Sequence, residues 1–311
     1  MIKEIAVIGA GGNMGCWFSR YFNNKGIGLS VYDINPASMK CSSNTIIYEN
    51  ITNCVQGADL VLVCVPTKTT PLMIHECASK MKPGAILAEI SSVKQQTSMA
   101  LKKISNSIKP LCIHPMFGPG RKDLKQMKIL LIPVRNEENE LKILNEIFEE
   151  AIVVVIPNAK IHDELIGVVL GLTHYINMVF AGTISKQDLS YLRDVTGTTF
   201  EIQSLLAASI MTEEPDLLIS LLLENQSVKK HIQNYLSESN KVARLIFDEN
   251  DLDLKTKYLK IRSILQQHQN LESSYKRMYQ IVEKLRDYKG TRIIPEGKIR
   301  RVNKDKICVS R

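Results

Sequence analysis

The feature that most constrains the fold of this chain is a glycine-rich turn close to its start. An apolar run at residues 3–9 leads into the turn, which reads Gly9-Ala10-Gly11-Gly12-Asn13-Met14-Gly15. A helical pattern with one apolar stripe follows at residues 13–25, and a second apolar run at 28–33 ends in an aspartate. A strand, a tight turn, a helix and a second strand in this order predict the first unit of a dinucleotide-binding α/β sheet.

The glycine spacing departs from the common G-x-G-x-x-G, because the third glycine falls one place late. We interpret the turn as G-x-x-G-x-x-G on Gly9, Gly12 and Gly15. Glycine permits the tight turn and lets backbone N–H groups approach a pyrophosphate at the positive end of the helix. The alternative is a sharp strand–helix turn that binds no ligand. The residues that we expect to contact the cofactor are Gly9, Gly11, Gly12, Asn13, Met14, Gly15, Asp33 and Pro66.

Asp33 bears on the choice of cofactor. A carboxylate at the end of the second strand can accept hydrogen bonds from the ribose hydroxyls of the adenosine, and it would repel a 2′-phosphate. The next residues, Ile34-Asn35-Pro36, supply no arginine, although Lys40 is near. The sequence therefore predicts NAD, with NADP as the alternative. Without a cofactor, Asp33 would be a turn residue before Asn-Pro.

Strand-like and helical patterns alternate up to Pro157. Apolar runs typical of buried strands occur at residues 59–66, 85–90, 111–113, 128–133 and 151–156. Helical patterns separate several of them, as at 70–80 and 138–149. This alternation predicts a Rossmann-type, doubly wound, mostly parallel sheet with helices on both faces.

Beyond Pro157 only helical periodicity remains, at residues 160–185, 187–193, 199–212, 214–248 and 254–287. We therefore expect an α/β plus all-α fold. It would comprise a dinucleotide-binding Rossmann domain at 1–157, an all-helical domain at 158–289 and a basic C-terminal tail at 290–311. The last helix is amphipathic, so it packs either on its own domain or on a partner subunit.

The distribution of charge and the spacing of the cysteines argue against several classes of protein. The net charge is +8, of which residues 290–311 contribute +5, and we expect a solvated tail there rather than a nucleic-acid site. The seven cysteines form no CxxC pair, which argues against a disulfide framework or a zinc site and favours a reducing cytoplasm. The first strand leaves no room for a signal peptide, and the longest apolar runs are broken by Thr, His and Asn, so we expect no membrane span.

Two loops at the carboxyl ends of predicted strands carry the remaining chemical signal, because that edge of a parallel sheet faces the ligand. The first is Ser91-Ser92-Val93-Lys94, and the second is His114-Pro115-Met116-Phe117-Gly118-Pro119-Gly120. A histidine at a strand end can accept a proton near neutral pH, so His114 is our candidate general base. Ser92 could hydrogen-bond the same substrate hydroxyl. The alternative for His114 is an ordinary loop histidine.

Taken in order, these motifs resemble a known family. Gly-x-x-Gly-x-Met-Gly, then Ser-Val-Lys, then His-Pro-Met-Phe-Gly-Pro, then His162-Asp163 and His174 are similar to the prephenate/arogenate dehydrogenases of tyrosine biosynthesis. The resemblance runs from about residue 3 to 230. It implies a Rossmann domain followed by a helical domain that mediates homodimerisation.

The resemblance implies an oxidative decarboxylation. A cyclohexadienol that bears a ring carboxylate would give a hydride to the nicotinamide and lose CO2, and the ring would become aromatic. By family position, His114 would deprotonate or polarise the hydroxyl, Ser92 would hydrogen-bond to it, and His174 would face the nicotinamide and substrate. Lys94 would hold the loop or the cofactor region, and no metal is required. We interpret His162-Asp163 as structural, at the start of a helix.

The match weakens where the family places arginines that bind the substrate carboxylate. Those positions correspond to Glu201 and Ser209, neither of which can replace the bidentate geometry of arginine. Arg193 is the candidate replacement, and Arg121, Lys229 and Lys230 are weaker ones. An acidic Glu201 would suit an amino group, which would point to arogenate instead of prephenate.

Two other functions stay open. One is a different nicotinamide enzyme of Rossmann-plus-helical design, such as a β-hydroxyacid dehydrogenase or an imine reductase. Such an enzyme would be expected to use a lysine or aspartate on the interdomain helix, where this chain offers His174. The other is a non-catalytic NAD-binding regulatory protein. The absent arginines support it, whereas the presence of Ser92, His114 and His174 argues against it.

Overall fold

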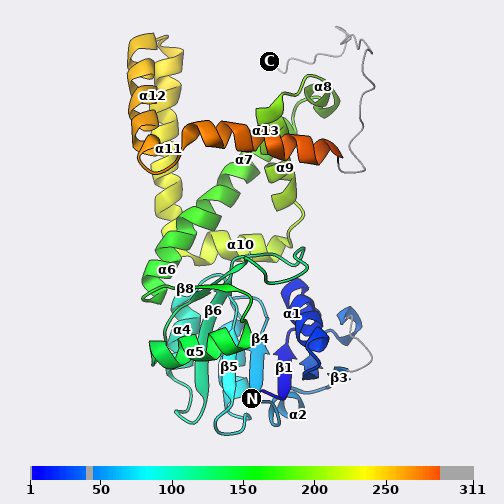
Figure 1. Cartoon of the computed structure of the whole chain (residues 1–311). Helices are drawn as coiled ribbons and strands as arrows, with labels where there is room; N and C mark the ends of the chain where they lie inside the picture. The colour runs from blue at the N-terminus through cyan, green and yellow to red at the C-terminus, as the bar shows by residue number, and fades with distance from the viewer. Residues whose placement is uncertain (1, 40–44, 288–311) are drawn as a thin grey trace. The chain divides into compact units, whose positions relative to one another are not determined.

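The computed structural model describes residues 2–39 and 45–287. The chain folds into two compact units (Figure 1). The first comprises Met1–Gly171 with Pro215–Val228, and the second comprises Leu172–Glu214 with Lys229–Arg311. The predicted basic tail at 290–311 and Lys40 both lie outside the described residues.

An eight-stranded sheet forms the middle of the first unit. Its strands are β1 (Glu4–Ile8), β2 (Gly28–Tyr32), β3 (Thr45–Ile47), β4 (Leu60–Val63), β5 (Ile86–Glu89), β6 (Lys109–Pro115), β7 (Lys128–Leu131) and β8 (Ile152–Val155). The order across the sheet is β3-β2-β1-β4-β5-β6-β7-β8. All pairs are parallel except β6 with β7, so the prediction of a mostly parallel, doubly wound sheet is confirmed.

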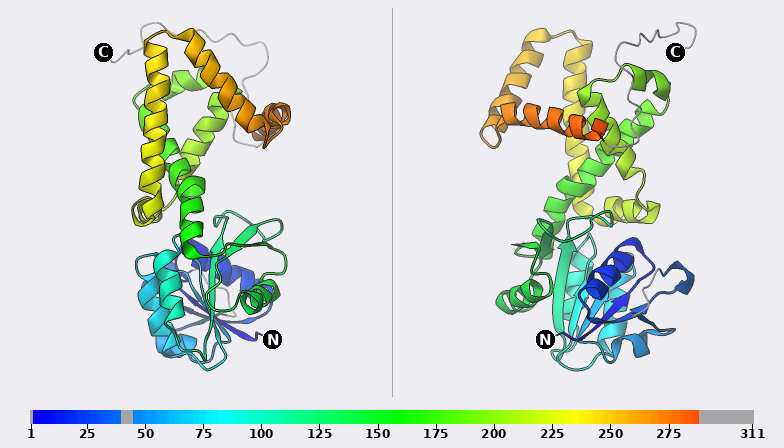
Figure 2. Two further views of the ribbon diagram at one scale, coloured as in Figure 1. Left: turned by 90° about the vertical axis from the view of Figure 1, so that its left-hand side faces the viewer. Right: turned by 45° about the vertical axis from the view of Figure 1, so that its right-hand side comes forward.

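Helices cover both faces of this sheet, as the turned views in Figure 2 show. On one face, α1 (Asn13–Asn24) and α5 (Glu137–Ile147) enclose a core that includes Phe18, Phe22 and Phe148. On the other face, α2 (Ile51–Val55), α3 (Thr70–Ala78) and α4 (Gln95–Lys102) enclose a second core that includes Ile74 and Leu101. The central strands β1 and β4 contribute to both cores, which explains their continuous apolar sequences.

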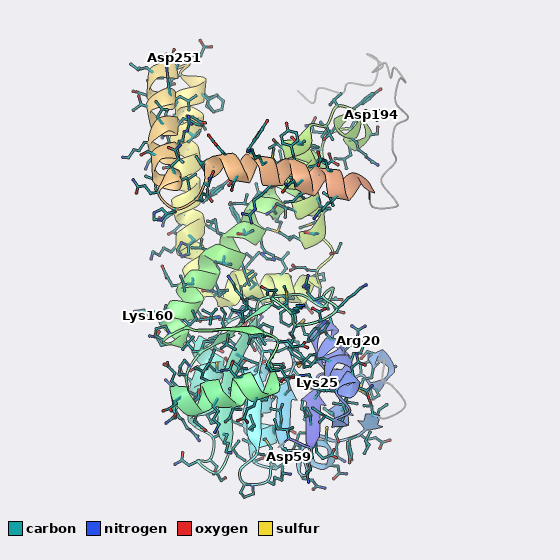
Figure 3. The ribbon with its side chains drawn as sticks, viewed as in Figure 1. Arg20, Lys25, Asp59, Lys160, Asp194 and Asp251 are labelled. Carbon is teal, nitrogen blue, oxygen red and sulfur yellow. The ribbon has the colours of Figure 1, made fainter. Side chains whose placement is uncertain are left out.

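The two ends of the first unit differ in what they carry. Asp59, just before β4, lies at one end of the unit, and Lys160, in the first turn of α6, lies at the opposite end (Figure 3). The glycine-rich turn follows β1, and the loops that begin at Ile90 and Met116 follow β5 and β6. Parallel strands end at the same edge of the sheet, so these three segments share the carboxyl edge, where α/β sheets bind their ligands.

The remainder of the described chain is helical. It comprises α6 (Ala159–Ile166), a π-helical segment (Gly167–Leu172), α7 (Thr173–Ile184), α8 (Leu189–Asp194), α9 (Thr198–Ile210), α10 (Pro215–Glu224), α11 (Gln226–Phe247), α12 (Asp251–Gln266) and α13 (Leu271–Asp287). The helices predicted at 214–248 and 254–287 are each divided in two, near Asn225 and near residues 267–270.

The helical segments are shared between the two units. The first unit contains α6 and α10, both of which the sequence analysis assigned to the helical domain. Within the first unit, Asn225 donates from Nδ2 to the Asp163 carbonyl at 2.8 Å, and Gly171 lies so close to Val228 that a Cβ there would collide with its side chain. In the second unit, α9 packs against both α7 and α13.

One helical run is apolar enough to pass a test for a membrane span. Ala159–Ile184 is 26 residues long with a mean hydropathy of 1.6, although its interruptions by Thr, His and Asn led us to expect none. Core helices of water-soluble proteins pass the same test, so this one helix is weak evidence for a membrane. Its first turns carry His162 and Asp163, both fully buried in a polar network of the first unit.

Candidate active site

The glycine-rich turn is closed by contacts that exclude side chains. Gly9 has φ of +86°, and a Cβ there would collide with the Cys64 carbonyl at the end of β4. A Cβ at Gly15 would collide with the Gly9 carbonyl, because α1 packs tightly on the strand that precedes it. At Gly12 the nearest atom to a Cβ would be 3.4 Å away. The need for glycine is therefore strongest at Gly9 and Gly15 and weak at Gly12, which we had grouped with them.

Asp33 is tied to this turn directly. Its Oδ2 accepts a hydrogen bond from the Gly11 N–H at 2.8 Å, and its Oδ1 accepts one from the Asn35 N–H at 2.8 Å. A Cβ on Gly11 would reach both Asp33 and the Ser38 hydroxyl. Both contacts involve side-chain atoms that can shift, so they favour glycine at position 11 without requiring it. The Asp33 carboxylate is held beside the turn that would receive the adenosine side of a dinucleotide.

The other predicted cofactor residues flank the turn. Gly12 is the N-cap of α1 and has no side chain to satisfy the first N–H groups of the helix, and Asn13 begins the helix with an exposed side chain. These N–H groups and the helix dipole suit a pyrophosphate. Met14 is half-buried, and Pro66 is exposed after β4, where its carbonyl accepts from the Thr69 hydroxyl. The residues present therefore fit a dinucleotide.

His114 lies near the carboxyl end of β6 and is 3% exposed. Its Nδ1 is 3.0 Å from Nε2 of His162, whose Nδ1 is 2.8 Å from Oδ1 of Asp163. Burial lowers the pKa of His114 well below its usual value, and the positive charge of Lys94 and the adjacent His162 ring lower it further. His114 is therefore neutral at physiological pH, which is the state that a proton acceptor needs.

A fully buried ion pair contacts the strand that carries this histidine. The Lys94 ammonium is 2.7 Å from the Glu89 carboxylate at the end of β5, and it also donates to the carbonyl of Ile113, the residue before His114. Glu89 further accepts hydrogen bonds from Cys112, Thr97 and the Ser91 N–H. Each buried charge is thus compensated, and Lys94 connects the loop after β5 to the strand that carries His114.

The loop after His114 is held by α1. The indole Nε1 of Trp17 donates to the Arg121 carbonyl at 2.6 Å, and the Phe117 ring lies 5.0 Å from the Trp17 ring, centroid to centroid. Trp17 lies two residues beyond Gly15, so one helix both begins at the glycine-rich turn and anchors the loop that follows the candidate base.

The other predicted catalytic residues are not in the network around His114. Ser92 is half-buried in the loop between β5 and α4, and the structure shows no hydrogen bond between it and His114. His174 belongs to the second unit, where its Nε2 is 3.2 Å from Oε1 of Glu213. Arg193, the candidate ligand for a substrate carboxylate, is exposed in the last turn of α8 in the same unit. Within residues 2–39 and 45–287, no group of three or more His, Cys, Asp or Glu side chains could hold a metal ion.

Sequence reasoning missed two members of this network. His162 and Asp163 were interpreted as a structural helix start, yet both side chains are fully buried and His162 contacts His114. The Asp163 carboxylate also accepts hydrogen bonds from the N–H groups of Lys94 and Gln95, at the start of α4. A signal was available, since adjacent His and Asp on an apolar helix must find polar partners if they are buried.

Comparison with known proteins assigns the chain to a family. The model of the prephenate dehydrogenase nucleotide-binding domain matches residues 18–157, and the model of the prephenate dehydrogenase dimerization domain matches residues 158–261. The chain belongs to the prephenate dehydrogenase family. The expected family and the expected nucleotide-binding domain are thereby confirmed, and this is a family of oxidoreductases.

Individual relatives agree with this assignment. A probable arogenate/prephenate dehydrogenase of Methanocaldococcus jannaschii is 27% identical over 252 residues, which cover 78% of this chain and 56% of that protein. The T-protein of Haemophilus influenzae is 21% identical over 80% of this chain and 63% of its own length. The chain thus matches little more than half the length of these relatives.

The fold has solved counterparts. The prephenate dehydrogenase of Aquifex aeolicus, crystallised with hydroxyphenyl propionate and NAD+, superposes with a TM-score of 0.68 at 20% identity. The match covers 86% of this chain and 98% of that one. This likeness confirms the architecture of a nucleotide-binding sheet followed by helices.

Proposed function

We propose that this protein is an NAD-dependent prephenate dehydrogenase, which converts prephenate to 4-hydroxyphenylpyruvate and CO2 in tyrosine biosynthesis. The observation that carries the proposal is His114, a buried neutral imidazole near the carboxyl end of β6, in the nucleotide-binding unit of a dehydrogenase family. NAD, when bound, supplies the hydride acceptor. The turn from Gly9 to Gly15 and the Asp33 carboxylate support this choice of nucleotide.

The proposed role of His114 is to take the proton from the substrate hydroxyl. Loss of that proton raises the electron density on the ring carbon that bears the oxygen, so the hydride leaves more easily. The bond to the ring carboxylate then breaks, its electron pair enters the ring, and CO2 departs. The oxygen recovers the proton from His114, and the phenol forms. Aromatisation drives the reaction, so the protein mainly positions the ring and holds one proton until the product oxygen takes it back. Ser92 and His174 are proposed to contact the same substrate, and Arg193 its side-chain carboxylate.

Arogenate is a second candidate substrate, because one observation favours it. Glu201 lies in the first turn of α9, at a position where the family's arginine is expected. A carboxylate there suits the amino group that arogenate carries in place of the prephenate keto group. A ratio of kcat/KM values for the two substrates decides between them, since discrimination follows from that ratio.

The assay that tests the proposal mixes the purified chain with NAD and prephenate and follows NADH absorbance. We expect turnover by the wild-type protein and a loss of about 10²–10⁴-fold in kcat for His114→Asn, the range that removal of a general base commonly costs. His75→Asn, a change of an exposed histidine on α3, is the matched control and should be fully active. No NADH from either prephenate or arogenate would contradict the proposal and would favour a non-catalytic nucleotide-binding protein.

A further inference from the structure

Three buried side chains of the first unit form a chain of two hydrogen bonds. His114 Nδ1 is 3.0 Å from His162 Nε2, and His162 Nδ1 is 2.8 Å from Asp163 Oδ1. His162 and Asp163 are fully buried and His114 nearly so. Among the described residues, Nε2 of His114 has no hydrogen-bond partner, so the chain runs from a free ring nitrogen to a carboxylate.

The Asp163 carboxylate determines which atom donates and which accepts in each of the two hydrogen bonds. Backbone N–H groups can only donate, and Asp163 accepts from the N–H of Lys94 at 2.8 Å and from that of Gln95 at 3.1 Å. These donors stabilise the ionised carboxylate, which can only accept. His162 must therefore carry its hydrogen on Nδ1. Burial lowers the pKa of His162, so its ring is neutral and its Nε2 holds a lone pair.

The tautomer of His162 determines the tautomer of His114. Because His162 Nε2 is an acceptor, His114 must place its own hydrogen on Nδ1. The lone pair of His114 is then on Nε2, the nitrogen that is free to meet a substrate. We propose that His162 and Asp163 are positioning residues that hold His114 in its Nδ1–H tautomer, so that Nε2 is the proton acceptor of the reaction. This inference rests on the proposed function for its catalytic meaning, but the tautomer itself does not.

The neighbouring charges support the same state. The charged groups acting on the two rings are the Lys94 ammonium, the Glu89 carboxylate and the Asp163 carboxylate. Lys94 opposes protonation of both rings, whereas the two carboxylates favour protonation of His162. Because the pKa of His114 is lowered, kcat/KM should be constant above about pH 6.5 and should fall only at lower pH, where His114 becomes protonated.

The tautomer can be measured without any assay of activity. The chain contains six histidines, so ¹⁵N labelling of histidine and a long-range ¹H–¹⁵N correlation spectrum at about pH 8 give the tautomer of each ring. The signals of His114 are identified by their absence from His114→Asn. We expect the Nδ1–H form for His114 and also for His162. An Nε2–H form of His114 in the wild-type protein would overturn the proposal, even if the enzyme is active.

Two substitutions of His162 separate positioning from folding. His162→Leu removes the acceptor, so His114 should revert to the Nε2–H form that free histidine favours. We expect kcat to fall by about 10²-fold or more, approaching the roughly 10⁴-fold cost of a wrong tautomer in the serine-protease triad, with little change in the Kd for NAD. His162→Gln keeps an oxygen acceptor near the position of Nε2 and should retain activity within about 10-fold of the wild type.

The outcomes distinguish this proposal from the proposed function. Equal kcat values for wild type and His162→Leu would overturn the positioning role, as would equal losses in the Leu and Gln variants with an unchanged His114 tautomer. If neither variant folds, the wild-type spectrum still decides the tautomer. A wild-type protein that shows the Nδ1–H form but turns over neither prephenate nor arogenate would contradict the proposed function and leave the hydrogen-bond chain intact.

Discussion

At the scale of single residues, Asp33 holds the glycine-rich turn and is also the residue that we propose selects the cofactor. Its two oxygens hold the N–H groups of Gly11 and Asn35, so the carboxylate is fixed at the end of β2 before any ligand arrives. A fixed negative charge opposes a 2′-phosphate more strongly than a mobile one, because it cannot move away. We therefore propose that the contact that closes the glycine-rich turn also favours NAD over NADP.

We expect Asp33→Asn to weaken this preference. The amide can still accept from Gly11 but carries no charge, so the ratio of kcat/KM for NAD to that for NADP should fall by about 10-fold, or about 1.4 kcal/mol. The measurement is steady-state kinetics with each cofactor. Asp253→Asn, on exposed α12, is the control and should leave the ratio unchanged. An unchanged ratio in Asp33→Asn would show that the charge does not select the cofactor.

At the scale of secondary-structure elements, the Asp59 carboxylate connects the starts of β1 and β4 at the amino edge of the sheet. Asp59, before β4, accepts from the N–H groups of Lys3 and Glu4 at the start of β1 and from the Lys82 ammonium at 2.6 Å. The hydrogen bond from Lys82 is the largest influence, and these contacts lower the pKa of Asp59 to about 2. The carboxylate therefore stabilises the folded state at neutral pH.

This stabilisation should disappear as the pH falls. A carboxyl whose pKa is lower in the folded state contributes fully above its unfolded pKa of about 3.9, and the contribution is lost toward the folded value. Because solvent screens this partly exposed pair, we expect Asp59→Asn to lower the free energy of unfolding by about 1 kcal/mol at about pH 7 and by roughly half as much at about pH 3.

Urea denaturation followed by fluorescence of Trp17, the single tryptophan, reports on this unit. Since Asp253 is in the second unit, Asp253→Asn should leave the Trp17 transition unchanged at both pH values. A deficit in Asp59→Asn that is equal at neutral and acidic pH would contradict the assignment to an ionised Asp59.

For the whole molecule, the second unit carries apolar side chains that remain exposed. On α12, Tyr258, Ile261 and Leu265 follow one another at helical spacing and are 62%, 45% and 42% exposed. The family's dimerization model ends at Ile261. We propose that a second copy of this chain covers the apolar stripe, as the homodimer inferred from the family resemblance requires.

Sedimentation equilibrium tests the proposed dimer. We expect a mass of about twice the 35.1 kDa chain for the wild type at micromolar concentration. The double substitution Ile261→Asp and Leu265→Asp should shift the protein toward the monomer, because it buries two charges in the contact. Lys260→Asp on the same helix is the control. A wild-type monomer would contradict the dimer, and a double variant that stays dimeric would place the contact elsewhere.

The sequence by itself determined the local elements and the family. Residues 3–33 specify a strand, a glycine-rich turn, a helix and a second strand through local steric demands, and buried parallel strands are visible as continuous apolar runs. The ordered motifs around Ser92, His114 and His174 indicated the family. The short strand β3 and helices α2 and α4 were missed, because each has little periodicity of its own.

Only the tertiary structure decided which residues act together. His162 lies 48 positions from His114 in the chain, and no periodicity relates the two, yet burial forces each ring to find a polar partner. The same reasoning applies to α10, whose placement in the first unit depends on packing and not on its own sequence. Neighbouring residues determine the local helices, strands and turns. A buried polar network depends instead on which distant groups the fold brings within hydrogen-bond reach.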